Sequence, residues 1–207
     1  MTKQKNEGFS LEKVLRKTFK GLLDGVASFF LKIGFTPNAV TLLGLAGSIG
    51  AAVLIALGMP LWGGIILLLM APLDAVDGAM ARLSGKSSKF GAFLDSVIDR
   101  YSELFIYAAI LYMFFEQGNF LGVMVCFAAA SGAVLVSYTR ARAEALGFDA
   151  KVGVMTRVER SIVMIVGLLF GIIVISLVII AVLAHLTAMM RMVTVWKQAK
   201  SRDPEPN

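Results

Sequence analysis

The sequence is poor in charged residues and has almost no cysteine or histidine. Of its 207 residues only 16% are charged and 57% are hydrophobic, whereas soluble domains average roughly 25% charged residues. The single cysteine, Cys126, excludes a disulfide within the chain and lies in an apolar run, where a packed thiol is expected. The single histidine, His185, is assigned no functional role. Residues 1–8 are polar and charges recur after them, which argues against a cleavable signal peptide.

Long apolar runs fill the rest of the chain, and about 20 such residues suffice to cross the ~30 Å hydrocarbon core of a bilayer. We predict an all-α membrane protein with one domain over residues 1–207, comprising six transmembrane helices within 36–198 and a tail over 199–207. The first four spans are expected at 37–58, 60–83, 88–115 and 119–147. The uncharged run 161–190 is too long for one span, so it is split near Gly171–Ser176 into a fifth and a sixth.

The N-terminal segment has a different pattern. Apolar residues recur at helical spacing over residues 9–34, and Lys13, Arg16, Lys17 and Lys20 lie between them. This pattern predicts an interfacial amphipathic helix within residues 1–35, with its lysines near anionic headgroups. The alternative is a leader helix that is simply solvated.

The basic residues indicate an orientation. All 20 Lys and Arg lie in residues 1–36, 82–100, 140–160 and 191–207, which a six-span topology brings to one side. The positive-inside rule then predicts a multi-pass protein of the cell membrane with both termini cytoplasmic. The net charge of +6 is attributed to this topology, and nucleic acid is not expected as a partner.

Four carboxylates stand out against this apolar background. Asp74 and Asp77 are three residues apart, and Asp95 and Asp99 are four apart, so each pair lies on one helix face at the cytoplasmic end. Close carboxylates repel unless they are protonated or neutralised by cations, and an ionised group at membrane depth costs at least ~2.5 kcal/mol. Carboxylate oxygens without nearby His or Cys favour two Mg²⁺ or Mn²⁺ ions over zinc, an arrangement suited to phosphate transfer.

Small and basic residues accompany the acids. Gly78 and Gly91 leave room for a ligand against the backbone, and Arg82 is placed to meet a phosphate. Ser88 is placed to cap the third span and to offer its hydroxyl and nearby N–H groups to an anion. The alternative is that the acids only pair with neighbouring lysines and arginines and that the glycines only serve helix packing.

This pattern resembles the signature of the CDP-alcohol phosphotransferases. It reads Asp74-x-x-Asp77-Gly78-x-x-Ala81-Arg82, eight residues, then Gly91-x-x-x-Asp95-x-x-x-Asp99. The resemblance extends to the six spans, the N-terminal helix and the stretch "TPNAVT" at 36–41. It implies a homodimeric enzyme in which an acceptor hydroxyl attacks the lipid-side phosphate of a CDP-linked lipid and CMP leaves.

The resemblance also assigns roles to residues. Asp74, Asp77 and Asp95 would hold the metal ions, and Asp99 would be the general base and touch the second ion. The residues expected to bind the CDP-lipid are Asn38, Thr41, Gly78, Arg82 and Ser88.

The acceptor is suggested by two further stretches. "DSVIDRYSE" and "SYTRARAEALG" resemble the branch of the family that uses inositol 1-phosphate, with either diacylglycerol or archaeol as the donor's lipid. Arginine forks suit a phosphomonoester, and Glu144 and Glu159 are expected to orient four of them, namely Arg140, Arg142, Arg157 and Arg160. These arginines are alternatively positive-inside anchors. Other functions left open are transfer to glycerol 3-phosphate and, outside enzymes, divalent-cation transport.

Overall fold

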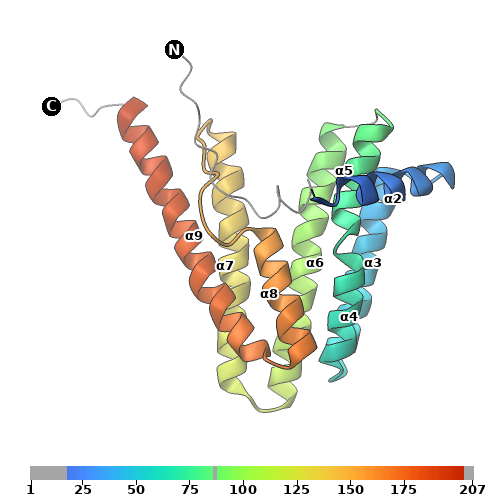
Figure 1. The fold of residues 1–207 in the computed structure, drawn as a ribbon. Coiled ribbons are helices and arrows are strands. Elements are labelled where there is room, and N and C mark those ends of the chain that lie inside the picture. Colours follow the sequence, from blue (N-terminus) through green and yellow to red (C-terminus); the bar gives the residue numbers. More distant parts are fainter. Residues whose placement is uncertain (1–17, 86–87, 203–207) are drawn as a thin grey trace.

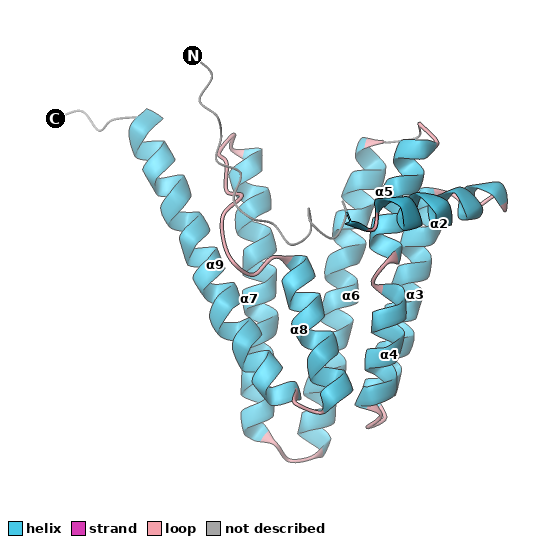
Figure 2. Cartoon of the chain, in the orientation of Figure 1, coloured by secondary structure: helices cyan, strands magenta, loops and turns pink. Residues whose placement is uncertain are grey.

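The computed structural model describes residues 18–85 and 88–202, and every regular element within them is an α-helix (Figures 1 and 2). The all-α prediction is confirmed. The helices are α2 (Lys20–Lys32), α3 (Pro37–Ala56), α4 (Pro60–Met70), α5 (Leu73–Leu83), α6 (Lys89–Glu116), α7 (Phe120–Ala145), α8 (Arg157–Phe170) and α9 (Ile173–Arg202).

Four helical stretches are long and apolar enough to cross a membrane: Pro37–Ala56, Pro60–Leu83, Phe120–Ala145 and Ile173–Arg202. The other two helices of the predicted six differ from these. The α6 helix carries the acids Asp95, Asp99 and Glu103 before its buried apolar residues begin, and α8 has only 14 residues, which rise about 21 Å at 1.5 Å per residue. A membrane protein is therefore supported, and the count of six spans stays a prediction.

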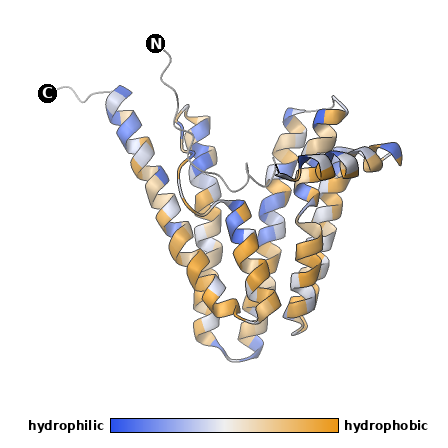
Figure 3. Cartoon of the chain, in the orientation of Figure 1, coloured by the Kyte–Doolittle hydropathy of each residue, from blue (hydrophilic) through white to orange (hydrophobic). Residues whose placement is uncertain are grey.

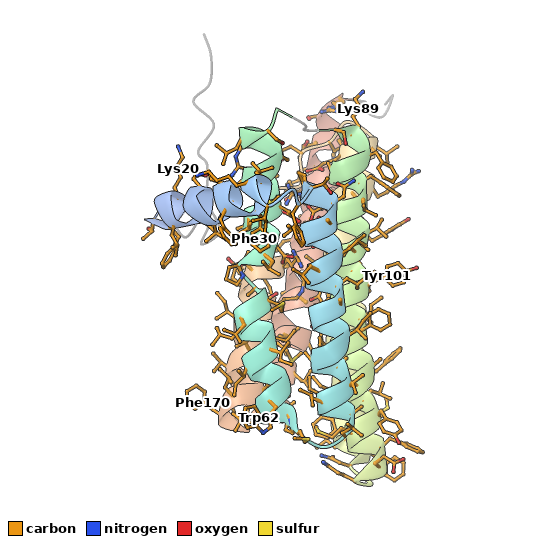
Figure 4. The ribbon with its side chains drawn as sticks, turned by 90° about the vertical axis from the view of Figure 1, so that its right-hand side faces the viewer. Lys20, Phe30, Trp62, Lys89, Tyr101 and Phe170 are labelled. Atoms are coloured by element: carbon orange, nitrogen blue, oxygen red, sulfur yellow. The ribbon has the colours of Figure 1, made fainter. Side chains whose placement is uncertain are left out.

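Polar residues gather at one end of the bundle (Figure 3). Lys20 and Lys89 lie at this end, whereas Trp62 and Phe170 lie at the opposite end (Figure 4). This arrangement agrees with the one-sided distribution of Lys and Arg in the sequence. The side of the membrane that the polar end faces remains a prediction.

Local sequence signals account for several helix ends. Thr36 caps α3, where its hydroxyl accepts a hydrogen bond from the Ala39 N–H at 3.2 Å. Ser88 caps α6 as predicted, accepting from the Gly91 N–H at 2.9 Å. Gly171 ends α8 with φ of 71°, a left-handed conformation that glycine adopts without steric cost. The predicted division of the last apolar run near Gly171 is confirmed.

The predicted second span, 60–83, matches a stretch that is long and apolar enough to cross a membrane, and its helix is interrupted once. Pro72 separates α4 from α5, because proline has no N–H to continue the helix and its ring clashes with the preceding turn. This break lies two residues before Asp74. The acid pair therefore lies on its own helix, which is separate from the apolar helix before it.

Two hydrophobic cores hold the helices. The larger core joins α3, α6, α7, α8 and α9. Glycine allows close packing in the bundle: a Cβ built on Gly64 of α4 would lie 2.9 Å from the Cβ of Leu168 on α8. The smaller core lies under α2, where Leu23 and Ala27 pack with apolar residues of α3 and α5.

The helix α2 lies across the polar end of the bundle (Figures 1 and 4). Leu22 and Phe29 on α2 and Ile33 just after it are exposed, while Leu23 and Ala27 are buried. Residues 9–17 of the predicted amphipathic helix lie outside the described residues. Its location at a membrane interface stays a prediction.

Candidate active site

A cavity of about 750 Å³ lies among α2, α3, α4, α5, α6 and α8. Its charged lining includes Asp74, Asp95 and Asp99, which the sequence analysis selected as metal ligands. Its apolar lining comes from two places. One is the start of α2, with Phe19, Leu22 and Leu23, and the other is α4, with Leu67 and Leu68. The cavity thus combines an acidic wall with a surface suited to a lipid.

The acids of α5 rest against α3. Asp77 is buried, and the Thr41 hydroxyl donates a hydrogen bond of 2.7 Å to its Oδ2. Asp74 stands opposite Gly44, where an added Cβ would lie 3.9 Å from the Asp74 Oδ1. The start of α3 thus orients one carboxylate and leaves room beside the other.

The two acid pairs are joined by an arginine from a third helix. Arg157, the first residue of α8, places one guanidinium nitrogen 2.7 Å from Asp74 and another 2.7 Å from Asp99. Arg100 adds a contact of 3.3 Å to Asp99. The two acid pairs lie on helices that both pack against α3, and the guanidinium of Arg157 bridges Asp74 and Asp99.

The carboxylate oxygens of the acidic wall are of the type that hard divalent cations prefer as ligands. Within residues 18–85 and 88–202, no three acidic, histidine or cysteine side chains stand close enough together to form a ready metal cage. However, Asp74 and Asp99 already share one cationic partner across the cavity. Carboxylate oxygens are the ligands that Mg²⁺ and Mn²⁺ prefer, and a divalent ion would neutralise more of the acidic wall than a guanidinium does.

Arg160, another arginine selected from the sequence, is held by an acid that the sequence analysis missed. Its side chain is only 1% exposed, and Glu103 accepts from its Nε at 2.6 Å and from its Nη2 at 2.8 Å. Glu159 was expected to orient an arginine but instead forms a capping box with Thr156 at the start of α8. The expected pairing of Glu144 is found, with Arg140 at 3.0 Å.

The α7–α8 loop, residues 146–156, is fastened along α9, and this fixes where α8 begins. The Gln198 side chain donates to the Asp149 carbonyl at 2.6 Å and accepts from its N–H at 3.1 Å. The buried Arg191 donates to the Val152 carbonyl at 3.0 Å, and Thr187 accepts from the Met155 N–H at 3.1 Å. Arg157 and Arg160 therefore enter the cavity from a firmly attached backbone.

The remaining predicted residues lie around this centre. Asn38 comes close to the start of α6, since a Cβ on Gly91 would lie 3.4 Å from its Oδ1. At the end of α5, a Cβ on Gly78 would lie 3.5 Å from Nη1 of the exposed Arg82. Ser88 is exposed at its cap. Arg142 is exposed on α7 and, within the part of the chain that the structure describes, is outside the cavity lining.

Two signals for the missed residues are present in the sequence. Glu103 follows Asp95 and Asp99 at the same four-residue spacing, which places all three on one face of α6. On α3, Thr41, Gly44 and Ser48 follow each other at spacings of three and four residues, and the cavity lining includes the last two. The sequence analysis named Thr41 for donor binding, whereas Glu103, Gly44 and Ser48 lie outside the signature and were not selected.

Comparison with known proteins agrees with this geometry. A family model described as CDP-alcohol phosphatidyltransferase matches residues 35–197. A phosphatidylinositol phosphate synthase of Streptomyces avermitilis is 37% identical over 93% of this chain and 85% of its own length. An archaetidylinositol phosphate synthase of Pyrococcus horikoshii is 36% identical over 86% of this chain and 92% of its own length.

Solved structures of the Mycobacterium tuberculosis phosphatidylinositol phosphate synthase share the fold. The structure with CDP-DAG bound superposes with a TM-score of 0.79 at 29% identity, covering 84% of this chain and 93% of that one. The structure in complex with manganese and citrate gives a TM-score of 0.77 at 28% identity, covering 84% of this chain and 88% of that one.

Proposed function

Because the chain belongs to the CDP-alcohol phosphatidyltransferase family, we propose that it transfers the phosphatidyl group of a CDP-linked lipid to a hydroxyl of inositol phosphate and releases CMP. The observation that carries this proposal is one cavity that joins an acidic wall, arginines and an apolar surface. Relatives named phosphatidylinositol phosphate synthase and archaetidylinositol phosphate synthase support inositol phosphate as the acceptor. The donor's lipid is diacylglycerol or archaeol.

The metal ions are proposed to bind at the acidic wall, and the two-ion count belongs to this proposal. Asp74, Asp77, Asp95 and Asp99 would hold two Mg²⁺ or Mn²⁺ ions, and a related structure that contains manganese supports this choice. The ions would neutralise the pyrophosphate and the charge that develops on the departing CMP. Thr41 orients Asp77 through its hydrogen bond, so we assign it a positioning role in addition to donor binding.

Asp99 is proposed as the general base. It is buried and borders the cavity, where its carboxylate can accept the proton of the acceptor hydroxyl. The hydroxyl oxygen then bonds to the lipid-side phosphorus. The bond between this phosphorus and the bridging oxygen breaks, and that oxygen leaves with CMP.

The two parts of the CDP-lipid donor are proposed to bind on different sides of the acids. The CDP group would contact Asn38 and Thr41 on the first turns of α3, Gly78 and Arg82 on α5, and Ser88 before α6. The lipid would lie along the apolar lining formed by α2 and α4.

The acceptor phosphate is proposed to bind to arginines that enter from α7 and α8. Arg140 and Arg157 border the cavity with partly exposed side chains, and a phosphate dianion suits such a fork. Arg160 also borders the cavity but is occupied by Glu103, so we assign it the task of shaping the site. Arg142 would contribute at the rim through its charge.

The membrane arrangement belongs to this proposal as well. Six spans would place the polar end, both termini and the cavity at the cytoplasmic face of the cell membrane, with α2 in the interface. The working unit would be a homodimer.

The test is a measurement of CMP release by protein reconstituted in nanodiscs, with CDP-diacylglycerol, Mn²⁺ and one acceptor at a time. We expect turnover with inositol 1-phosphate and much less with free inositol or glycerol 3-phosphate. Preferential use of glycerol 3-phosphate would reject the proposed acceptor. Movement of Mg²⁺ into liposomes without any CMP release would reject the enzyme in favour of a transporter.

A further inference from the structure

The contact of Arg157 with two acids at once has a consequence beyond the proposed reaction. Its Nη2 lies 2.7 Å from Oδ2 of Asp74 on α5, and its Nη1 lies 2.7 Å from Oδ1 of Asp99 on α6. These two acids belong to the proposed metal-binding set. In the described structure, the oxygens that a metal ion would need are therefore engaged by the chain's own guanidinium.

A guanidinium and a divalent cation compete for such oxygens. Mg²⁺ requires ligand oxygens at about 2.0–2.1 Å, so it takes the space and the lone pairs that the arginine nitrogens use. The replacement is favoured by charge, because the two carboxylates carry two negative charges and the guanidinium carries one positive charge. The displaced guanidinium in turn needs a new anionic partner, because burying an unpaired charge is costly.

Arg157 differs from its neighbour in its freedom to move. Its side chain is 26% exposed and it borders the cavity from the first turn of α8. Arg160 is 1% exposed and is held by both oxygens of Glu103. The fastened α7–α8 loop keeps the backbone in place, so the exchange requires a change of side-chain rotamer only.

We propose that Arg157 and a divalent cation exclude each other between Asp74 and Asp99, and that the released guanidinium then binds the phosphate of the acceptor. Metal and phosphate consequently bind cooperatively, and Arg157 transmits the coupling. This inference rests on the proposed function for the identity of the anion. The competition between arginine and metal does not depend on it.

The direct test is Mn²⁺ affinity, measured by electron paramagnetic resonance on the full chain in nanodiscs without substrate. The variant Arg157→Lys keeps the charge, but its ammonium lacks the fork that spans two carboxylates. We expect Arg157→Lys and Arg157→Gln both to bind Mn²⁺ more tightly than the wild type, by about 5- to 150-fold, the usual range for coupled sites. The matched control Lys197→Gln removes an exposed charge on α9 and should bind Mn²⁺ like the wild type.

The second arm adds inorganic phosphate to the same measurement. In the wild type, phosphate should raise the Mn²⁺ affinity, and Mn²⁺ should raise the phosphate affinity by the same factor. Both effects should shrink in Arg157→Gln.

The inference would be overturned if Arg157→Lys bound Mn²⁺ no more tightly than the wild type. This includes the case in which only Arg157→Gln binds more tightly, because that result would reflect the lost charge and not the lost bridge. CMP release by the wild type with inositol 1-phosphate is measured in parallel. If CMP is released but the Mn²⁺ affinities do not change as expected, the exchange is refuted and the proposed function stands; if no CMP is released, the proposed function itself fails.

Discussion

The buried ion pair between Arg160 and Glu103 leads to the sharpest prediction about stability. The change is Glu103→Leu, which removes the acid and leaves the guanidinium in place. Arg160 is 1% exposed, and the acid accepts two hydrogen bonds from it, at 2.6 and 2.8 Å. Without that partner the positive charge remains in the core of α8 and α6, where water does not solvate it.

The size of the effect follows from burial. Removing one partner of a buried ion pair costs about 3–5 kcal/mol, whereas an exposed pair contributes about 0.2–1 kcal/mol. The chain contains a matched control, because Arg140 and Glu144 form a single contact of 3.0 Å with side chains 46% and 45% exposed. We therefore expect Glu103→Leu to lower the free energy of unfolding several times more than Glu144→Leu does.

The assay is equilibrium unfolding in mixed micelles, followed by the loss of helical circular dichroism. The double variant Glu103→Leu/Arg160→Met buries no charge at this position and should recover much of the loss, because apolar residues of similar volume replace a buried pair at little cost. The reasoning is refuted if Glu103→Leu is no worse than Glu144→Leu, or if the double variant is less stable than Glu103→Leu alone.

Three further predictions concern the acidic wall. Thr41→Val removes a hydrogen bond to a carboxylate, worth about 1.5–3 kcal/mol, and should lower kcat/KM for CMP release about 10- to 150-fold, while Thr41→Ser should retain most activity. Asp99→Asn should abolish CMP release and leave binding of radiolabelled CDP-lipid largely intact; strong residual turnover would reject Asp99 as the base. Removal of divalent ions with EDTA should stop CMP release, and added Mn²⁺ or Mg²⁺ should restore it.

Much of the helical architecture was predictable because its signals are local. Apolar runs, the cap at Ser88 and the turn at Gly171 each act within a few residues, and all three appear where the sequence indicated. Pro72 was also visible in the sequence. Its effect was missed because the apolar run around it is continuous and reads as one span.

The partners of the charged residues were harder to predict, because they depend on contacts between distant segments. Arg157 meets acids on α5 and α6, and Arg160 meets an acid 57 positions away. In both cases several acids lie within reach of a long side chain, so spacing alone does not select one. Glu159, expected to orient an arginine, is engaged in the described structure by the N–H and the hydroxyl of Thr156, because a capping box forms at the start of α8.

The two acid-bearing segments, α4–α5 and α6, keep their carboxylates apart from their apolar residues in different ways. Both place polar and apolar segments in series, since an ionised carboxylate costs at least ~2.5 kcal/mol at membrane depth. The first of these segments is broken at Pro72, so that apolar α4 packs on α3 and α8 while α5 packs on α2 and α3. The second of these segments, α6, is unbroken, and its buried apolar residues begin at Ile106, after Asp95, Asp99 and Glu103. Asp74 and Asp99 thereby border the same cavity, where a single guanidinium contacts both.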